Sequence, residues 1–242
     1  MSQLATATSA DLTLSYRLPY WQKAYLPILR GPLTGSRWLP ASGGKIVRLF
    51  CGTYEKTQSK LFQELIEDDA VVFDIGANVG YYTLLSARLA SKGHVVAFEP
   101  EPRNIAFLRA NVAANRCRNV SIHELAVAAE AGFANFQMGT GTGTGKLSNE
   151  GSLRVPMISL DEFVDQQQMR PTHMKIDVEG AEVDVLRGGR ETLINCRPTI
   201  FLSTHGRKVH AACCEFLREL NYDLRCMDGG DLAEADSVLC TR

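Results

Sequence analysis

The chain has 242 residues, of which 45% are hydrophobic and 22% charged, and its net charge is −1. This is the composition of one large globular domain, or of one domain with an arm. The balanced charge disfavours broad nucleic-acid binding, and no apolar run approaches the roughly 18 residues of a membrane helix. The seven cysteines show no CxxC pair and no zinc spacing. We therefore expect a cytoplasmic protein with reduced thiols and with neither a nucleic-acid nor a membrane partner.

Residues 1–45 are predicted to form an N-terminal arm on a domain that spans residues 46–242. The arm holds both tryptophans and loose segments that contain proline, and its first residues have the composition of disordered chain. Residues 16–30 have the pattern of a short amphipathic helix interrupted by Pro27. The arm is expected to pack on the domain or on a second subunit, as in a homodimer. An arm that caps the substrate or touches a membrane is the alternative.

From residue 46 onward, segments with strand and helix patterns alternate. The predicted strands span residues 45–51, 70–76, 94–100, 120–127, 172–178, 199–205, 222–228 and 236–241. The predicted helices span residues 57–66, 79–91, 102–116, 182–195 and 209–220. This alternation predicts an α/β fold built of βαβ units, with a mainly parallel sheet and right-handed crossovers. Only a short turn separates the last two strands, so they must form a hairpin, and one edge strand is expected to run antiparallel.

Residues 132–164 break this alternation. Two β-like runs flank a centre rich in glycine, threonine and serine, with Gly139, Gly141, Gly143 and Gly145 at every second position. Such spacing predicts a mobile connection, because glycine restricts the backbone least. The segment is either the tip of a floppy hairpin or a lid over the active site.

The stretch VVFDIGANVGYYTLL, residues 71–85, predicts a strand that turns tightly into a helix around a ligand. The NAD fingerprint GxGxxG would need glycine where Asn78 and Tyr81 stand, and Asn78 would obstruct a pyrophosphate. The loop does contain D-x-G-x-x-x-G, formed by Asp74, Gly76 and Gly80. An acid before the first glycine suits a cationic ligand such as S-adenosylmethionine, whose carboxylate can use amides at the helix start. An NAD-dependent oxidoreductase is the weaker alternative.

Acidic residues also end two later strands. Glu99 follows the apolar run at residues 95–98, where a carboxylate can accept both ribose hydroxyls of either NAD or S-adenosylmethionine. Lys175, Asp177 and Glu179 alternate with apolar residues and share one face of a strand. Charges on a central parallel strand must be paired or lie near its open end. We therefore expect Asp177 and Glu179 to lie near the transferred group.

Taken together, these segments resemble the FkbM family of S-adenosylmethionine-dependent methyltransferases. The resemblance is carried by VVFDIGANVGYYTLL, VVAFEPEPRNIAFLRANV, SLDEFV, MKIDVEGAEVDVLRGG, STHG and GTYEK, and it covers about residues 46–228. It implies a Rossmann-like class I fold with a doubly wound, mostly parallel seven-stranded sheet. It also implies methyl transfer, usually to oxygen, from S-adenosylmethionine to a small-molecule or glycan acceptor, with S-adenosylhomocysteine as the product. A fold without turnover, as in a binding or scaffold protein, is the alternative.

The resemblance assigns most of the expected cofactor site residue by residue. Asp177 is expected to face the methionine moiety or the acceptor, and Glu55 either reaches the cofactor ammonium or braces the loop. Residues 124–127 lie where adenine is expected, with the small Ala126 in place of an acid. The residues expected to bind the cofactor are Glu55, Asp74, Gly76, Ala77, Asn78, Gly80, Glu99, Pro100, Asn104, Glu124, Ala126 and Asp177.

Methyl transfer to a hydroxyl is an in-line displacement that also needs a base. The candidates for the base are Asp177 and His205. Lys175 holds an acidic acceptor or pairs with a neighbouring carboxylate, and Glu179 caps the following helix or takes part in the chemistry. Oxygens at Asp177 and Thr204 supply too few acids for a dedicated Mg²⁺ site, so the predicted reaction is metal-free.

Overall fold

The computed structural model describes residues 18, 24–43, 46–139, 141 and 145–242. The first residues of the arm, Trp21 and Gly143, about which the sequence led to expectations, lie outside this range. Seven strands form the main sheet in the order β12-β13-β11-β10-β3-β4-β5. They are β3 (Val71–Ile75), β4 (His94–Phe98), β5 (Val120–His123), β10 (His173–Ile176), β11 (Thr199–Ser203), β12 (Asp223–Cys226) and β13 (Ser237–Thr241).

The sheet is mostly parallel, which confirms the predicted fold class. Strands β11, β10, β3, β4 and β5 pair in parallel, whereas β13 pairs antiparallel with both β11 and β12. The expected hairpin of the last two strands is therefore present. The strand that runs against the others is β13, one position in from the edge, because the chain places β12 at the edge and then returns between β12 and β11.

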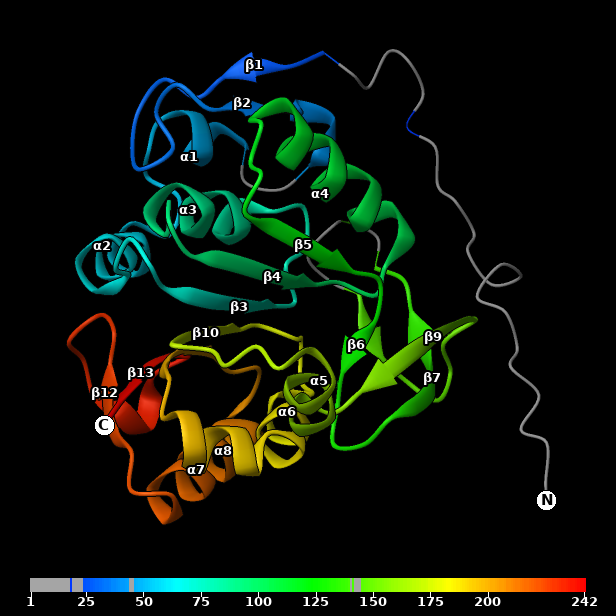
Figure 1. Ribbon diagram of the computed structural model, residues 1–242, viewed down its shortest axis with the longest axis vertical. Helices are drawn as coiled ribbons and strands as arrows, with labels where there is room; N and C mark the ends of the chain where they lie inside the picture. The colour runs from blue at the N-terminus through cyan, green and yellow to red at the C-terminus, as the bar shows by residue number, and fades with distance from the viewer. Residues whose placement is uncertain (1–17, 19–23, 44–45, 140, 142–144) are drawn as a thin grey trace.

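Helices cover both faces of this sheet (Figure 1). The helices are α1 (Ile46–Phe50), α2 (Lys56–Leu65), α3 (Tyr81–Leu89), α4 (Pro102–Ala114), α5 (Leu160–Gln167), α6 (Glu182–Gly188), α7 (Arg190–Cys196) and α8 (Arg207–Glu219). Alternate residues of each strand enter different cores. Val72 and Val95 pack with α2, α3 and α4, whereas Phe73 and Val96 pack with α5 to α8.

Several sequence predictions of secondary structure are wrong in detail. Residues 46–50 form the helix α1 instead of a strand, because short apolar runs do not distinguish the two and only Leu49 of this helix is buried. The predicted helix at residues 182–195 is divided into α6 and α7 at Gly188 and Gly189. A Cβ at Gly188 would lie 2.1 Å from the carbonyl oxygen of Ala128, so the chain bends here against the neighbouring segment.

A further difference lies in the N-terminal arm. Its described part forms no helix at Pro27: β1 (Leu26–Pro27) pairs antiparallel with β2 (Arg37–Trp38). A short 3-10 helix (Pro40–Ser42) follows. Ile28, Trp38 and other apolar residues of this segment belong to the same core cluster as residues of α3 and α4. Residues 24–43 thus pack closely on the body of the protein, while the arm's separation as a unit stays a prediction.

A smaller sheet occupies the region where the alternation breaks. Its strands, in the order β6-β9-β7-β8, are β6 (Ala126–Val127), β7 (Gly132–Gln137), β8 (Lys146–Leu147) and β9 (Leu153–Ile158). The predicted strand at residues 120–127 is therefore divided, since β5 stays in the main sheet and β6 pairs with β9. A 3-10 helix (Leu232–Glu234) lies between β12 and β13. In the described ranges, no helix is long and apolar enough to cross a membrane.

Candidate active site

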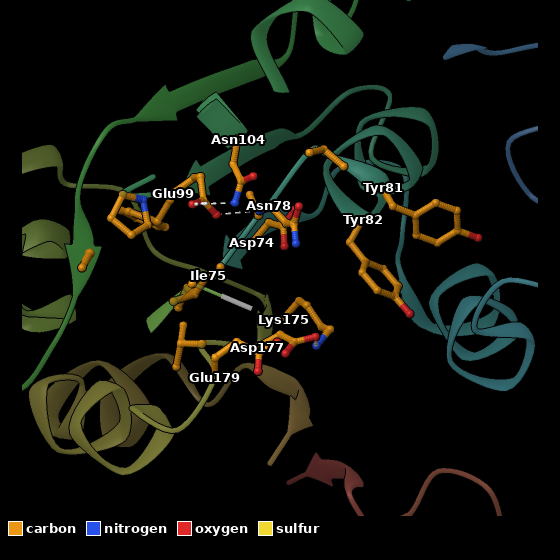
Figure 2. A pocket seen from close by; sticks show the side chains of 18 of the residues that line it. Asp74, Ile75, Asn78, Tyr81, Tyr82, Glu99, Asn104, Lys175, Asp177 and Glu179 are labelled. Carbon is orange, nitrogen blue, oxygen red and sulfur yellow. Dashed lines mark hydrogen bonds and ion pairs between the residues drawn. The ribbon is translucent and has the colours of Figure 1, made fainter. Parts of the chain in front are cut away.

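A cavity of about 360 Å³ opens at the carboxyl ends of β3, β4 and β10, where open α/β sheets bind their ligands. Figure 2 shows Glu99 on one side of it, Asp177 and Glu179 on the other, and Asp74 between them. The predicted site residues that line it are Glu55, Asp74, Gly76, Ala77, Asn78, Glu99, Pro100, Asn104, Ala126, Lys175, Asp177, Glu179 and His205. Segments far apart in the sequence therefore meet in one place.

Residues outside the main sheet close part of the cavity. Phe136 of β7, Leu147 of β8 and Gly145 line it, and Trp38 of β2 lines it as well. The hairpin β7–β8 thus lies where the lid hypothesis requires it. A Cβ at Gly145 would lie 2.6 Å from a carboxylate oxygen of Glu101, so Gly145 lies close to the start of α4.

Two glycines shape the loop after β3, each with positive φ. Gly76 has φ 83°, and a Cβ there would lie 1.9 Å from the carbonyl oxygen of Asp177. Only glycine permits this approach, which joins the loop to the residue after β10. Gly80 has φ 100° at the start of α3, and a Cβ there would lie 2.6 Å from Leu108. Gly80 packs against α4 and does not line the cavity.

Asp74 is buried near the end of β3, and its side chain is partnered. The hydroxyl of Thr83 donates a hydrogen bond of 2.5 Å to its carboxylate. Lys175 is its register partner on β10. Burial raises the pKa of Asp74 to about 6, although the Thr83 bond and the Lys175 charge act in the opposite direction. The cavity floor thus holds a carboxylate that a cationic ligand would help to keep ionised.

Glu99 follows β4 and accepts hydrogen bonds from three groups. One carboxylate oxygen accepts from the backbone N–H of Asn78 at 2.8 Å. The other accepts from the backbone N–H of Glu101 at 2.9 Å and from the side-chain amide of Asn104 at 3.3 Å. Burial nevertheless raises the pKa of Glu99 to about 7. These bonds fix a carboxylate at the position expected to receive the ribose hydroxyls.

The expected adenine region is only partly as predicted. Leu125, Ala126 and Val127 line the cavity beside Glu99 and form an apolar wall. The side chain of Glu124 does not line it and instead forms an ion pair with Arg109 of α4. Glu124 directly follows β5, and its pairing with Arg109 directs its side chain away from the cavity.

Glu55 lines the cavity beside a cluster of tyrosines that was not among the predicted site residues. The hydroxyl of Tyr82 donates to Glu55 at 2.5 Å, and Glu55 itself has φ 40°. Tyr54, Tyr81 and Tyr82 also line the cavity. Burial, followed by the nearby Glu55, raises the pKa of Tyr54. Glu55 is thus bonded to Tyr82 of α3, and both of its expected roles, as a brace of the loop and toward a ligand ammonium, stay predictions. The tyrosine pair directly after the glycine loop was the available signal.

Lys175 is only 1% exposed and is committed to neighbouring groups. Its ammonium donates to the hydroxyl of Ser203 at 2.8 Å, to Asp177 at 3.1 Å and to the carbonyl of Ile176 at 3.2 Å. It also lies 5.5 Å from the centre of the Tyr82 ring. Of the two roles expected for Lys175, the structure supports the pair with a carboxylate.

His205 follows β11 and lies between carboxylates. Its Nε2 is 3.4 Å from Glu179 and 3.7 Å from Asp177. Its Nδ1 lies 2.8 Å from Glu182 of α6, a buried acid that the sequence reading did not select although it stands in the same motif. The bond to Glu182 is the largest of the causes that raise the pKa of His205. Burial raises the pKa of Glu179, which has φ 54°.

The same cluster also has the spacing of a cation site. The ligand atoms of Asp177, Glu179 and His205 lie within 4.8 Å of one another. The sequence predicts a metal-free reaction because the possible ligands there were Asp177 and Thr204. The structure instead brings Glu179 and His205 close to Asp177. Chelation of divalent ions therefore tests the prediction of a metal-free reaction directly.

Comparison with known proteins identifies the family. The model of the methyltransferase FkbM domain matches residues 74–224, which is more than half of the chain. The chain belongs to the FkbM methyltransferase family. The match begins at Asp74 and takes in the glycine loop after β3, Glu99, the Asp177 motif and His205, whereas residues 46–73 and 225–228 of the expected resemblance lie outside it.

Two curated relatives of this FkbM-family chain are methyltransferases. The hexuronic acid methyltransferase AglP of Haloferax volcanii is 33% identical over 138 residues, which are 55% of this chain and 56% of AglP. The 2-O-methyltransferase NoeI of Sinorhizobium fredii is 29% identical over 163 residues, which are 59% of this chain and 66% of NoeI. The chain thus spans between about half and two thirds of the length of these relatives.

A solved structure agrees on the fold. The FkbM methyltransferase of Methylobacillus flagellatus superposes with a TM-score of 0.54 at 17% sequence identity, over 73% of this chain and 44% of that one. At this identity the likeness concerns the fold alone. It supports the Rossmann-like class I architecture.

Proposed function

We propose that this FkbM-family protein transfers a methyl group from S-adenosylmethionine to an oxygen, a hydroxyl or a carboxylate, of a small-molecule or sugar acceptor. One observation carries the proposal: a single cavity contains the buried carboxylate of Glu99 and, on its other side, the cluster of Asp177, Glu179 and His205. The first group suits a nucleoside ribose, and the second suits the activation of an acceptor. We propose neither nucleic acid nor membrane as a partner.

The chemistry of the lining groups fits S-adenosylmethionine. The cavity volume of about 360 Å³ lies within the range of small-molecule sites. The apolar wall of Leu125, Ala126 and Val127 suits an adenine ring. Asp74 and Asp177 supply negative charge where the ligand carries positive charge. When bound, the cofactor supplies a methyl group on a sulfonium leaving group, so the protein mainly has to align the acceptor and exclude water.

His205 is the proposed base in this reaction. Its Nδ1 is engaged by Glu182, so Nε2 is the nitrogen that takes the acceptor proton. Asp177 and Glu179 flank Nε2 and stabilise the imidazolium that forms. Lys175 holds the other oxygen of Asp177 and keeps that side chain directed along the cavity. Such a base contributes roughly 10²–10⁴-fold to the rate.

The name of AglP supports an oxygen of a sugar acid as the acceptor. A hexuronic acid offers both hydroxyl and carboxylate oxygens, and the name of NoeI specifies a 2-O position. Because the matches cover only part of those proteins, the acceptor class is a proposal for this chain.

A transfer assay with radiolabelled S-adenosylmethionine tests the proposed function. The acceptor panel contains neutral sugars, hexuronic acids, hydroxylated small molecules and, as negative controls, nucleic acid and protein amines. We expect label on an oxygen of a sugar or small molecule, and little or none with the Asp177→Asn variant. Label on nitrogen, or label only on nucleic acid, contradicts the proposal.

A further inference from the structure

Glu182 is a buried acid with an unusual set of contacts. It begins α6 and its exposure is 0%, yet it does not line the cavity. One carboxylate oxygen accepts from the backbone N–H of Gly180 at 3.1 Å and lies 2.8 Å from Nδ1 of His205. The other oxygen has no hydrogen-bond partner among the residues that the structure describes. Among the described residues, the imidazole of His205 is the one side chain that bonds this buried carboxylate, and such an arrangement calls for a functional explanation.

The contact determines which nitrogen of His205 carries the proton. When Glu182 is ionised, its carboxylate can only accept hydrogen bonds, and Nδ1 is then the donor. In the neutral ring, Nε2 is then the nitrogen with the free lone pair. His205 lines the cavity, and Nε2 is the atom that faces Asp177 and Glu179 there. The ring therefore presents a proton acceptor to the cavity and hides its donor.

We propose that Glu182 is the positioning residue of the active site: it holds His205 in the Nδ1–H form and fixes the ring so that Nε2 accepts the acceptor's proton. This rests on the proposed function, in which His205 is the base. Glu182 itself touches neither cofactor nor acceptor, because helix α6 holds it behind the histidine. The fold supports this arrangement, since Gly180 has φ 109° and turns its N–H back onto the Glu182 carboxylate.

The charged groups around His205 predict how its titration depends on Glu182. The loop after β10 contributes Asp177 and Glu179, and α6 contributes Glu182, all of which raise the pKa of His205. Further groups face these acids: Lys175 of β10 pairs with Asp177, Lys146 of β8 lowers the pKa of Glu179, and Glu182 raises the pKa of Cys213 of α8. Glu182 is the only one of the acids that bonds the ring at 2.8 Å. Its neutralisation should therefore lower the pKa of His205 most.

The first test measures the tautomer directly and needs neither acceptor nor turnover. The intact protein is labelled with ¹⁵N-histidine, and the His205 signals are assigned from the spectrum of His205→Asn. We expect neutral His205 in the wild type to carry its proton on Nδ1. A proton on Nε2 in the wild type overturns the proposal, and this readout does not depend on any variant at Glu182.

Variants at Glu182 give the second readout in the same experiment. Glu182→Gln should lower the pKa of His205 while keeping an oxygen for Nδ1, and Glu182→Ala should shift the neutral ring toward the Nε2–H form. Asp184→Asn is the matched control, because it removes an exposed carboxylate from the same helix. It should leave the His205 signals unchanged. Unchanged signals in both Glu182 variants contradict the proposal.

Enzyme kinetics then distinguish a role of Glu182 in positioning His205 from a role in the stability of the fold alone. With an active acceptor, Glu182→Gln should move the acidic limb of the kcat/KM profile to lower pH, in step with the pKa of His205. The affinity for S-adenosylmethionine should stay as in the wild type. A uniform loss of rate without a shift of that limb assigns Glu182 a structural role and refutes the proposal. Failure of the wild type to bind S-adenosylmethionine removes the proposed function, whereas the tautomer result stands by itself.

Discussion

Replacing Gly76 with alanine tests how tightly the loop after β3 is joined to the residue after β10. A Cβ at this position would lie 1.9 Å from the carbonyl oxygen of Asp177, and the residue has φ 83°. Gly35 provides a matched control, because its φ is 84° but nothing lies within 4 Å of its would-be Cβ. The free-energy cost of placing alanine at positive φ is therefore the same in both variants. The difference between their free energies of unfolding measures the contact with Asp177 alone.

The magnitudes follow from these two contributions. The left-handed conformation costs alanine about 1 kcal/mol, which should be the whole effect of Gly35→Ala. Gly76→Ala adds an overlap that forces a backbone shift, and overpacking of this kind costs about 1–3 kcal/mol or more. We expect a loss of about 2–4 kcal/mol for Gly76→Ala.

The assay is urea unfolding, with the free energy of unfolding extrapolated to water for the wild type and both variants. Calorimetry with S-adenosylmethionine on the folded variants adds a second readout. The Gly76 variant should bind it more weakly, whereas the Gly35 variant should bind it as the wild type does. Equal losses of stability in the two variants would refute the argument that this glycine is required by its contact with Asp177.

The remaining predictions concern the cavity itself. Asp74→Ala should abolish S-adenosylmethionine binding by calorimetry, because it removes the buried carboxylate of the cavity floor; unchanged affinity contradicts the cofactor assignment. Burial raises the pKa of Glu99 from 4.5 to about 7. Between these two pH values the folded state keeps a proton that the unfolded state has lost. The unfolding free energy of the wild type, minus that of Glu99→Gln, should therefore fall by about 3 kcal/mol as the pH rises through this window. If urea titrations show that this difference in unfolding free energy is the same at all these pH values, the raised pKa of Glu99 is contradicted. His205→Ala should lower kcat by roughly 10²–10⁴-fold with the affinity for S-adenosylmethionine nearly intact, and full activity removes it as the base. Treatment with EDTA should leave turnover unchanged; loss on chelation and recovery with Mg²⁺ would show that the cluster of Asp177, Glu179 and His205 holds a metal.

The features that the sequence predicts well are those carried by local patterns. The buried strand before Asp74, its glycine loop and the following helix are contiguous, and each has its own hydrophobic period. The charges at Asp177 and His205 follow strands that the fold places side by side, so their approach follows from the sheet order once the fold class is known.

The features that the sequence does not predict depend on contacts between distant segments. The pairing of Glu182 with His205 joins α6 to the end of β11. The ion pair of Glu124 with Arg109 turns a predicted site residue away from the cavity. The described part of the arm joins the core through Trp38, which no local pattern reveals. In each case the decisive partner lies far along the chain.

Titration calorimetry of the intact protein with S-adenosylmethionine, and in parallel with NAD, tests the central claim most directly. The account predicts saturable binding of S-adenosylmethionine that weakens in Glu99→Gln, because that variant loses the carboxylate proposed to receive the ribose hydroxyls. It predicts no comparable heat with NAD, whose pyrophosphate would meet the side chain of Asn78. Saturable binding of NAD, or no binding of S-adenosylmethionine, would contradict the account.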